Sequence, residues 1–251
     1  MGKIIAVVNQ KGGVGKTTTA VNLTAALTEA GKKVLLCDFD PQANATSGLG
    51  LEKKKLNRSV YDVVIDDVPT QDVIVSTPYG DVLPSSADLA GATVELITMP
   101  EANYRLKKAL EQVRNAYDLI LIDCPPSLEL LTLNGLTAAD GILVPVQCEY
   151  YALEGLADLM TTLRLAKKRL NPELEIFGVL LTMFDGRTNF STQVAQEVRK
   201  HFPGKVYATM IPRNVRLAEA PSHGLPVTGY DKHSRGAQAY RAVAQEIIKK
   251  G

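Results

Sequence analysis

The chain has 251 residues, of which 45% are apolar and 22% charged, and its formal net charge is +1. Normal apolar content and a small net charge exclude a mainly disordered chain. The three cysteines are too few for a disulfide framework, and no apolar run approaches the roughly 18 residues of a membrane-spanning helix. We expect a cytoplasmic protein without membrane insertion. No linker or internal repeat divides the sequence, so we expect one domain over residues 1–251.

Short runs of Val, Ile and Leu alternate with helical patterns along the whole chain. The runs lack alternating polar residues, which is typical of strands covered on both faces of a sheet. We expect an α/β fold with a doubly wound, mostly parallel sheet flanked by helices. The expected strands are 4–9, 34–39, 119–123, 142–146, 176–182 and 206–211, with one or two more at 73–76 and 82–83. The expected helices are 17–30, 104–116, 128–139, 149–170, 191–201 and 237–249.

Residues 11–18 read KGGVGKTT and connect the first expected strand to the first expected helix. A glycine-rich turn in this place lets backbone N–H groups point at phosphate oxygens, and the helix N-terminus adds its positive dipole end. The Lys16 ammonium neutralises charge on the β- and γ-phosphates, and the Thr17 hydroxyl can ligate Mg²⁺. The motif predicts a nucleotide site; a glycine-rich turn that binds nothing is the alternative. Its residues are Lys11, Gly12, Gly13, Val14, Gly15, Lys16, Thr17 and Thr18.

Carboxylates lie at the ends of two expected strands. Asp38 and Asp40 lie at the end of the second strand, and Asp123 ends the third. Ligands of parallel α/β sheets bind at the carboxyl ends of strands, so these acids are expected beside the phosphates. Asp123 is interpreted as the acid that holds Mg²⁺ through a water molecule. Asp38 and Asp40 share a face if the strand continues that far, and then one supports the metal while the other positions the attacking water. The alternative for Asp40 is a turn residue before Pro41.

Positive charge is concentrated in residues 187–216, which hold six basic residues and one acid, Glu197. A local net charge of +5 in a nearly neutral chain indicates an anion-binding surface. A solvated face that happens to be basic is the alternative. The basic residues are Arg187, Arg199, Lys200, Lys205, Arg213 and Arg216.

The phosphate loop departs from the standard G-x-x-x-x-G-K-[ST] motif, because Gln10 stands where the first glycine belongs and Lys11 precedes the glycine pair. This pattern resembles the deviant Walker A motif. With LLCDFDPQANATSGLG, LILIDCPPS, PVQCEYYALEG and IPRNVRLAEAPSHG, it resembles the ParA/Soj chromosome- and plasmid-partitioning ATPases over nearly the whole chain. The resemblance implies a P-loop NTPase fold, hydrolysis of ATP with Mg²⁺, and a sandwich homodimer that forms with ATP. It also implies that the dimer binds double-stranded DNA of any sequence on the nucleoid, and that a ParB-type centromere-binding partner stimulates hydrolysis and releases it.

The resemblance further implies roles for residues of the phosphate site. Lys11 matches the lysine that reaches the phosphates of the partner subunit's ATP, and Gly12 matches the point where the two subunits approach closely. Lys16 belongs to the phosphate cradle. Asp40 matches the acid that orients the hydrolytic water, next to the metal, and Asp123 matches the Walker B acid.

More distant positions also match the family. Glu149 matches a residue that contacts nucleotide across the dimer. Pro212 and Asn214 match the segment beside the adenine. The expected DNA contacts are Arg187 and Arg216, which match the family, and Arg213 and Lys200 of the same basic segment.

Two other functions share this fold class. A MinD-like membrane-associated division-site ATPase needs a C-terminal amphipathic helix with a basic face and bulky apolar residues. Tyr240, Val243, Ile247 and Ile248 recur at helical spacing, but a helix packed on the sheet is the favoured interpretation. A small-molecule ligase or synthetase does not need Lys11 or the basic segment. The phosphate loop starts at residue 11, so we expect no N-terminal helix-turn-helix domain and no sequence-specific operator binding.

Overall fold

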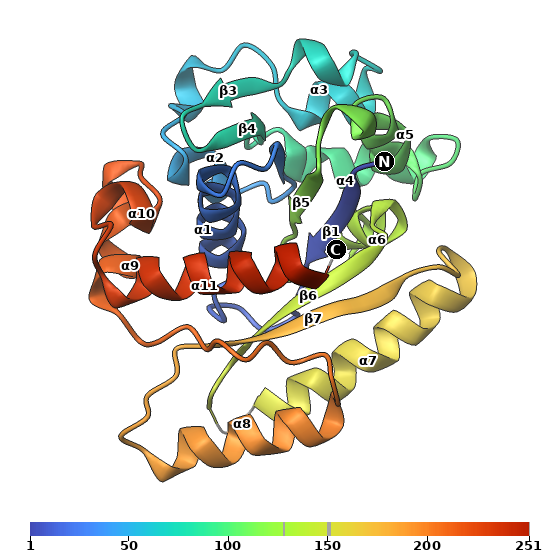
Figure 1. The fold of residues 1–251 in the computed structure, drawn as a ribbon. Coiled ribbons are helices and arrows are strands. Elements are labelled where there is room, and N and C mark those ends of the chain that lie inside the picture. Colours follow the sequence, from blue (N-terminus) through green and yellow to red (C-terminus); the bar gives the residue numbers. More distant parts are fainter. Residues whose placement is uncertain (128, 150–151, 251) are drawn as a thin grey trace.

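The computed structural model describes residues 1–127, 129–149 and 152–250. Its centre is a seven-stranded sheet in the order β3-β4-β2-β5-β1-β6-β7. β3 pairs antiparallel with β4, and the other neighbours are parallel. This confirms the predicted α/β class with a mostly parallel sheet (Figure 1). The strands are β1 (Lys3–Val7), β2 (Val34–Asp38), β3 (Val75–Thr77), β4 (Gly80–Leu83), β5 (Leu119–Asp123), β6 (Gly141–Gln147) and β7 (Glu175–Thr182).

Helices cover both faces of the sheet (Figure 1). Ile5 and Val7 of β1 pack in one cluster with α1 and α11, whereas Ile4 and Ala6 pack in the cluster on the other face. Because both faces are buried, the strands need apolar residues at successive positions. The helices are α1 (Lys16–Glu29), α2 (Asn44–Gly48), α3 (Val60–Ile65), α4 (Leu89–Thr98), α5 (Arg105–Glu111), α6 (Leu130–Ala138), α7 (Ala152–Arg169), α8 (Asn189–His201), α9 (Val215–Glu219), α10 (Val227–Tyr230) and α11 (Arg235–Lys250). Short 3₁₀ turns lie at Lys53–Lys55, Thr70–Asp72, Arg114–Ala116 and Ala220–His223.

The register of the central strands brings the phosphate loop and the acids to one edge of the sheet. β1 lies between β5 and β6, so that Val7 is beside Asp123 and Leu143. β2 pairs with β5 and sets Asp38 opposite Asp123. The loop that follows β1 therefore begins at the edge where these two carboxylates end their strands.

The amphipathic stripe of α11 is used for packing within the chain. Tyr240, Val243 and Ile247 are at most 3% exposed, and Ile248 packs partly against the same cluster, which includes α1. This agrees with the favoured interpretation of a helix packed on the sheet. Within the described ranges, no helix is long and apolar enough to cross a membrane.

The strand predicted at residues 206–211 is wrong. The backbone N–H groups of Tyr207 and Ile211 do donate to carbonyls of β7, at 3.0 and 2.8 Å. In a regular parallel ladder the donor after Tyr207 is Thr209, but the Thr209 N–H donates at 2.9 Å to the carboxylate of Glu246 in α11. The segment therefore forms one isolated bridge with β7, between Val206 and Val179, and no regular strand.

Three predicted helices differ in extent. The helix predicted at 104–116 ends early, because α5 stops at Glu111 and a 3₁₀ turn follows. In that turn the Arg114 guanidinium donates to the Gly2 carbonyl at 2.7 Å and pairs with Asp140 at 2.7 Å, which ties it to the N-terminus. The helices predicted to begin at 128 and 149 are α6 and α7, and residues 128, 150 and 151 lie outside the described residues.

Candidate nucleotide site and basic surface

The loop between β1 and α1 curls around the side chain of Lys16. Gly13 and Gly15 have φ angles of +74° and +89°, a region that residues with a Cβ rarely adopt, which explains the glycines. The Lys16 ammonium donates to a carbonyl oxygen of the same loop at 3.1 Å. From β7, the Thr182 hydroxyl donates to the Val14 carbonyl at 2.8 Å. These two hydrogen bonds hold the loop in a closed turn.

Gly12 is different from the other glycines of this loop. It is exposed, and its φ is not in the left-handed region. A Cβ added there would meet no atom within 4 Å. No contact within the described chain therefore requires glycine at this position.

Asp123 is a buried acid at the end of β5. Its side chain is 0% exposed, and neither carboxylate oxygen has a partner of normal geometry among the described residues. Burial raises the pKa of Asp123 well above its ordinary value, and the charge of Asp38 adds to this, while Thr17 and Lys16 oppose it. An unpartnered buried carboxylate is costly. With the Thr17 hydroxyl it offers the hard oxygen ligands that Mg²⁺ prefers, so these residues fit the metal.

Asp38, in contrast, is fully partnered by the chain. Its carboxylate accepts hydrogen bonds from the Thr46 N–H and the Thr46 hydroxyl, both at 2.7 Å, and from the Asp40 N–H at 3.3 Å. Burial raises the pKa of Asp38 to about 6, although these hydrogen bonds lower it. Asp38 therefore anchors the residues after β2.

Asp40 lies beyond the end of β2, so strand alternation does not set it on the same face as Asp38. Its carboxylate accepts the Gln42 N–H at 2.9 Å, and its carbonyl accepts the Ala43 N–H at 2.8 Å. These are turn interactions, as in the alternative considered for this residue. Asp40 is also close enough to Lys16 to oppose the lowering of the lysine pKa that burial causes. The geometry thus combines a turn with a position beside the phosphate loop.

A pocket of about 300 Å³ adjoins the phosphate loop. Pro212 and Asn214 lie in its wall opposite Gly15 and Thr18. The structure therefore brings the segment that was matched to the adenine side next to the loop. Sequence reasoning gave six residues of this wall no nucleotide role: three lie in the IPRNVRLAEAPSHG motif beside Pro212 and Asn214, and three lie at a strand end or in a packed helix without a motif. These residues are Thr182, Met183, Ile211, Leu217, Ala218 and Tyr240.

Glu149 lies just after β6 and contacts the pocket wall through Arg213. The Arg213 guanidinium donates to the Glu149 carboxylate at 3.3 Å, and the Gln147 side-chain amide donates to it at 2.6 Å. Arg213 lines the pocket. A predicted nucleotide contact and a predicted DNA contact thus form one ion pair at this edge of the sheet.

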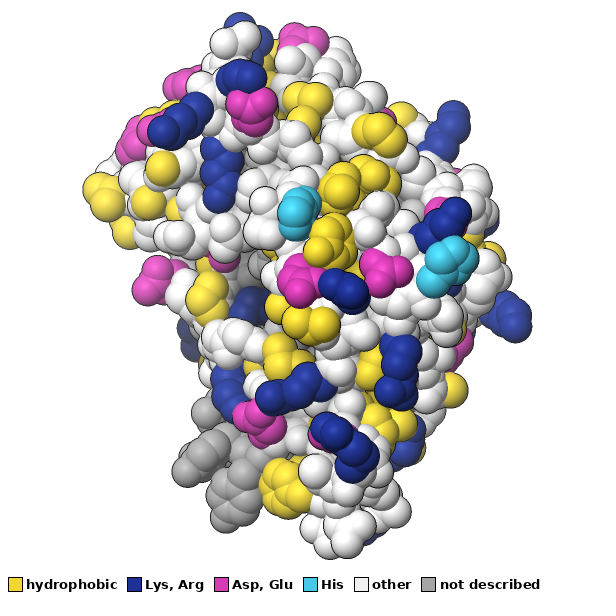
Figure 2. All heavy atoms as spheres, turned by 90° about the vertical axis from the view of Figure 1, so that its left-hand side faces the viewer, with side chains coloured by type: hydrophobic (Ala, Val, Ile, Leu, Met, Phe, Trp, Pro, Cys, Tyr) yellow, Lys and Arg dark blue, Asp and Glu magenta, His cyan; other side chains and the backbone are white. Residues whose placement is uncertain are grey.

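The predicted DNA-contact residues lie on the surface, and each is paired with a carboxylate. Figure 2 shows Lys and Arg side chains on the face that includes α9 and α10, with acidic side chains beside several of them. The loops that carry Arg187 and Arg213 are joined by the Arg213 N–H, which donates to the Phe184 carbonyl at 3.1 Å. The ion pairs are Arg187–Asp185 at 2.7 Å, Lys200–Glu197 at 2.6 Å, Arg213–Glu149 at 3.3 Å, Arg216–Glu219 at 2.8 Å and Arg216–Asp231 at 3.4 Å.

Lys200 is separated from the other three predicted DNA contacts. It lies near the end of α8, about 16 Å along the helix axis from the helix start, at about 1.5 Å per residue. Arg187 precedes that start. The structure therefore groups Arg187, Arg213 and Arg216 at the carboxyl edge of the sheet and leaves Lys200 apart.

The parallel sheet, the glycine loop between β1 and α1, and the buried acid at the end of β5 define a P-loop NTPase. The family model described as AAA domain matches residues 2–176. The chain is 58% identical to the sporulation initiation inhibitor protein Soj of Bacillus subtilis, with 100% of each chain covered. The chain belongs to the Soj/ParA family of chromosome-partitioning ATPases.

Two solved structures with the same fold hold a nucleotide and a metal. Cobyrinic acid a,c-diamide synthase from Mycobacterium smegmatis, with bound ADP and magnesium, is 40% identical and superposes with a TM-score of 0.87, covering 99% of this chain and 95% of that one. The septum site-determining protein MinD of Pyrococcus horikoshii, complexed with Mg-ADP, is 30% identical with a TM-score of 0.82, covering 100% and 97%. The related structures thus include a synthase and a MinD protein, the two alternative functions that the sequence analysis considered.

Proposed function

We propose that the protein is a DNA-partitioning ATPase, formed as one domain over residues 1–251, that binds and hydrolyses ATP with Mg²⁺. The observation that supports this best is the buried, unpartnered carboxylate of Asp123 beside Lys16 and Thr17. Such a group fits a bound cation, because no hydrogen bond of normal geometry from the described residues compensates its burial. The nucleotide and magnesium of the two related structures agree with this chemistry.

The residues of this chain divide the work of hydrolysis. Lys16 and the loop amides bind the phosphates, while Pro212 and Asn214 border the base. Bound Mg²⁺, held by Thr17 and by Asp123 through water, supplies positive charge to the phosphates. The Asp40 carboxylate accepts a hydrogen bond from the attacking water and orients it towards the γ-phosphate.

ATP acts as the switch by assembling a homodimer. Lys11 reaches the phosphates of the partner's ATP, where its charge offsets that of the transferring group. The open space around Gly12 supports this arrangement, because only an approaching molecule would require the absence of a Cβ there. Glu149 contacts the nucleotide across the same interface.

The dimer binds double-stranded DNA of any sequence through Arg187, Arg213 and Arg216, with Lys200 contributing at a distance. In the single chain each of these cations is neutralised by an acid. Two such surfaces on one dimer engage the same duplex, so the affinity rises through effective concentration. A ParB-type partner stimulates hydrolysis and releases the dimer, which places the protein in the cytoplasm on the nucleoid.

Sedimentation with non-specific DNA, with ATP, with ADP and without nucleotide, tests this function. We expect the protein to sediment with DNA only when ATP is present. Vesicles of anionic lipid replace DNA in a second arm, because the MinD-like alternative requires membrane binding. The burial of Tyr240, Val243 and Ile247 against the core leaves no apolar stripe on α11 for a bilayer, so we expect no vesicle binding. DNA binding of equal strength with ATP, with ADP and without nucleotide would contradict the proposal.

The variant Asp40→Ala is expected to bind ATP but to hydrolyse it about 100-fold more slowly or worse, because positioned acid–base groups contribute at least this much. The dimer should accumulate with ATP, as seen by size-exclusion chromatography. Asp40→Asn is the matched control, since its side-chain oxygen can still accept the Gln42 N–H of the turn. Normal ATP turnover in Asp40→Asn would show that Asp40 serves the turn and does not orient the attacking water.

The variant Gly12→Val is expected to fold and to bind ATP with an affinity within about threefold of the wild type, because the position has open space and an ordinary φ. It should remain monomeric with ATP in analytical ultracentrifugation. Gly13→Val serves as the contrast, because its φ of +74° strains any side chain and distorts the phosphate loop. A normal ATP-dependent dimer of Gly12→Val would exclude close approach at this position.

A further inference from the structure

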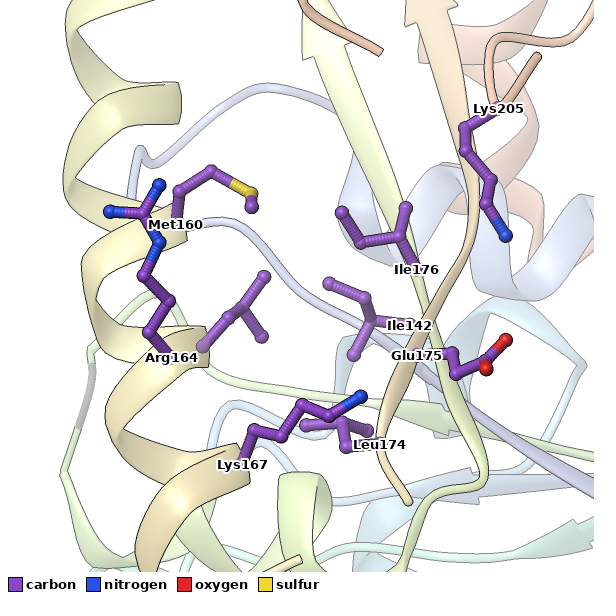
Figure 3. Close-up of a pocket in the computed structure, with 9 residues that line it drawn as sticks. Ile142, Met160, Arg164, Lys167, Leu174, Glu175, Ile176 and Lys205 are labelled. Carbon is purple, nitrogen blue, oxygen red and sulfur yellow. The ribbon is translucent and has the colours of Figure 1, made fainter. Parts of the chain in front are cut away.

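A second pocket, of about 360 Å³, lies at the end of the sheet opposite the phosphate loop, because it is lined by the first residues of β6 and β7. Figure 3 shows the side chains that line it. The pocket opens between α7 and the first residues of β6 and β7. None of the residues assigned to nucleotide or DNA lines it. Its lining consists of Ile142, Met160, Leu163, Arg164, Lys167, Leu174, Glu175, Ile176 and Lys205.

The floor of this pocket is apolar and well ordered by packing. Ile142, Leu174 and Leu163 are 0%, 4% and 7% exposed. Met160 and Ile176 are half-buried and extend the same surface towards the opening. Figure 3 shows Ile142 and Ile176 on the strands facing Met160 on α7. A floor of this kind favours an alkyl or aromatic group.

The rim of the pocket is cationic. Arg164 and Lys167 lie three residues apart on α7, so they are neighbours on one face of the helix. Lys205 lines the pocket from another segment. None of the three forms an ion pair within the part of the chain that the structure describes. Glu175 is the acid among the lining residues, so cations outnumber acids by three to one.

We propose that this pocket binds a small amphiphilic carboxylate, with its apolar body on the floor and its carboxylate at the α7 side of the rim, where Arg164 and Lys167 lie, while Lys205 adds positive charge from the opposite wall. The volume of about 360 Å³ lies at the lower end of the range of small-molecule pockets, roughly 300–1,000 Å³. The carboxylate relieves the repulsion between two like charges on one helix face. A cleft of this volume between a helix and two strand starts suits a free small molecule.

Methyl NMR with sodium octanoate as the probe tests this site directly. The chain has five methionines; Met160 lines this pocket and Met183 lines the nucleotide pocket. With ¹³C-methyl methionine, octanoate should shift the Met160 signal saturably and leave Met183 unchanged. Signals are assigned with Met160→Leu and Met183→Leu. Acetate, which lacks the apolar body, and octylammonium, which reverses the charge, should leave Met160 unmoved.

A charge-reversal pair locates the carboxylate. Arg164→Glu with Lys167→Glu should weaken octanoate binding about tenfold or more, since two charged contacts are lost. Lys168→Glu with Arg169→Glu makes the same charge change on the same helix outside the pocket lining, and affinity should stay within about twofold. The proposal is overturned if Met160 does not respond to octanoate, if octylammonium shifts it equally, or if both double variants weaken binding alike.

Discussion

Lys16→Ala is expected to abolish ATP binding. The Lys16 residue is only 7% exposed, and burial lowers its pKa, with the charges of Asp123 and Asp40 opposing the change. This cation is therefore already desolvated and fixed where the phosphates are expected. Hydrogen bonds to charged groups are worth about 1.5–3 kcal/mol each. The loss of two phosphate contacts thus weakens ATP binding by a factor on the order of 10² to 10⁴.

Isothermal titration calorimetry with a non-hydrolysable ATP analogue and Mg²⁺ measures this loss. Lys11→Ala is the matched control, because it removes the other lysine of the same loop, which is assigned to the partner's ATP. We expect near wild-type affinity for that variant in the monomer and no ATP-dependent dimer. Circular dichroism without nucleotide verifies that both variants are folded. Wild-type affinity in Lys16→Ala would refute the assignment of the phosphate loop.

The geometry of the glycine loop could be predicted from the sequence because its determinants are local. Gly13 and Gly15 adopt backbone angles that glycine alone favours, and the spacing to Lys16 follows from the turn into α1. Asp123 could be predicted because a buried strand ends there, and parallel pairing brings strand ends together. For Asp40 the condition that the strand continues that far is not met, since β2 ends at Asp38, although Asp40 still lies close enough to Lys16 to affect its pKa.

Features set by distant contacts could not be predicted. The segment 206–211 has a strand-like sequence, but the Glu246 carboxylate, far along the chain, binds the amide that a regular strand would use. The charge of the basic segment was also misjudged by counting along the chain. Residues 187–216 contain one acid, yet Asp185, Glu149 and Glu219 reach their arginines from outside that range. The net positive charge of the folded surface around these arginines is therefore smaller than the +5 counted along residues 187–216.

Arg216→Glu is expected to abolish DNA binding while leaving the ATP-driven dimer intact. Arg216 lies in α9, and its side chain is 47% exposed. It does not line the nucleotide pocket, although α9 contributes two other residues to that wall. Reversal of its charge adds a third acid beside Glu219 and Asp231. The surface then repels the phosphates that it should attract.

Salt titration of DNA binding measures how many phosphate contacts disappear. Each lost contact lowers the slope of log affinity against log salt by about 0.9, and each substitution occurs twice in a dimer, so the slope should fall by about 1.8. A partial substitution, Arg216→Ala, provides a variant whose residual binding can be titrated. Lys54→Glu is the charge-matched control at an exposed site outside the basic segment. If Arg216→Ala keeps the wild-type DNA affinity and salt slope, the basic segment is a solvated face and not a DNA-binding surface.

The neutral variant Glu219→Gln should act in the opposite direction. The Arg216 guanidinium donates to Glu219 at 2.8 Å, and this ion pair lowers the pKa of Glu219, so the acid stays charged near neutral pH. Glutamine keeps an acceptor oxygen for Arg216 but removes the negative charge that a DNA phosphate must displace. DNA affinity with ATP should rise about two- to fivefold, most strongly at low salt. Opposite effects from two residues in one ion pair separate electrostatic recognition from a general loss of folding, because a misfolded dimer could not bind DNA more tightly.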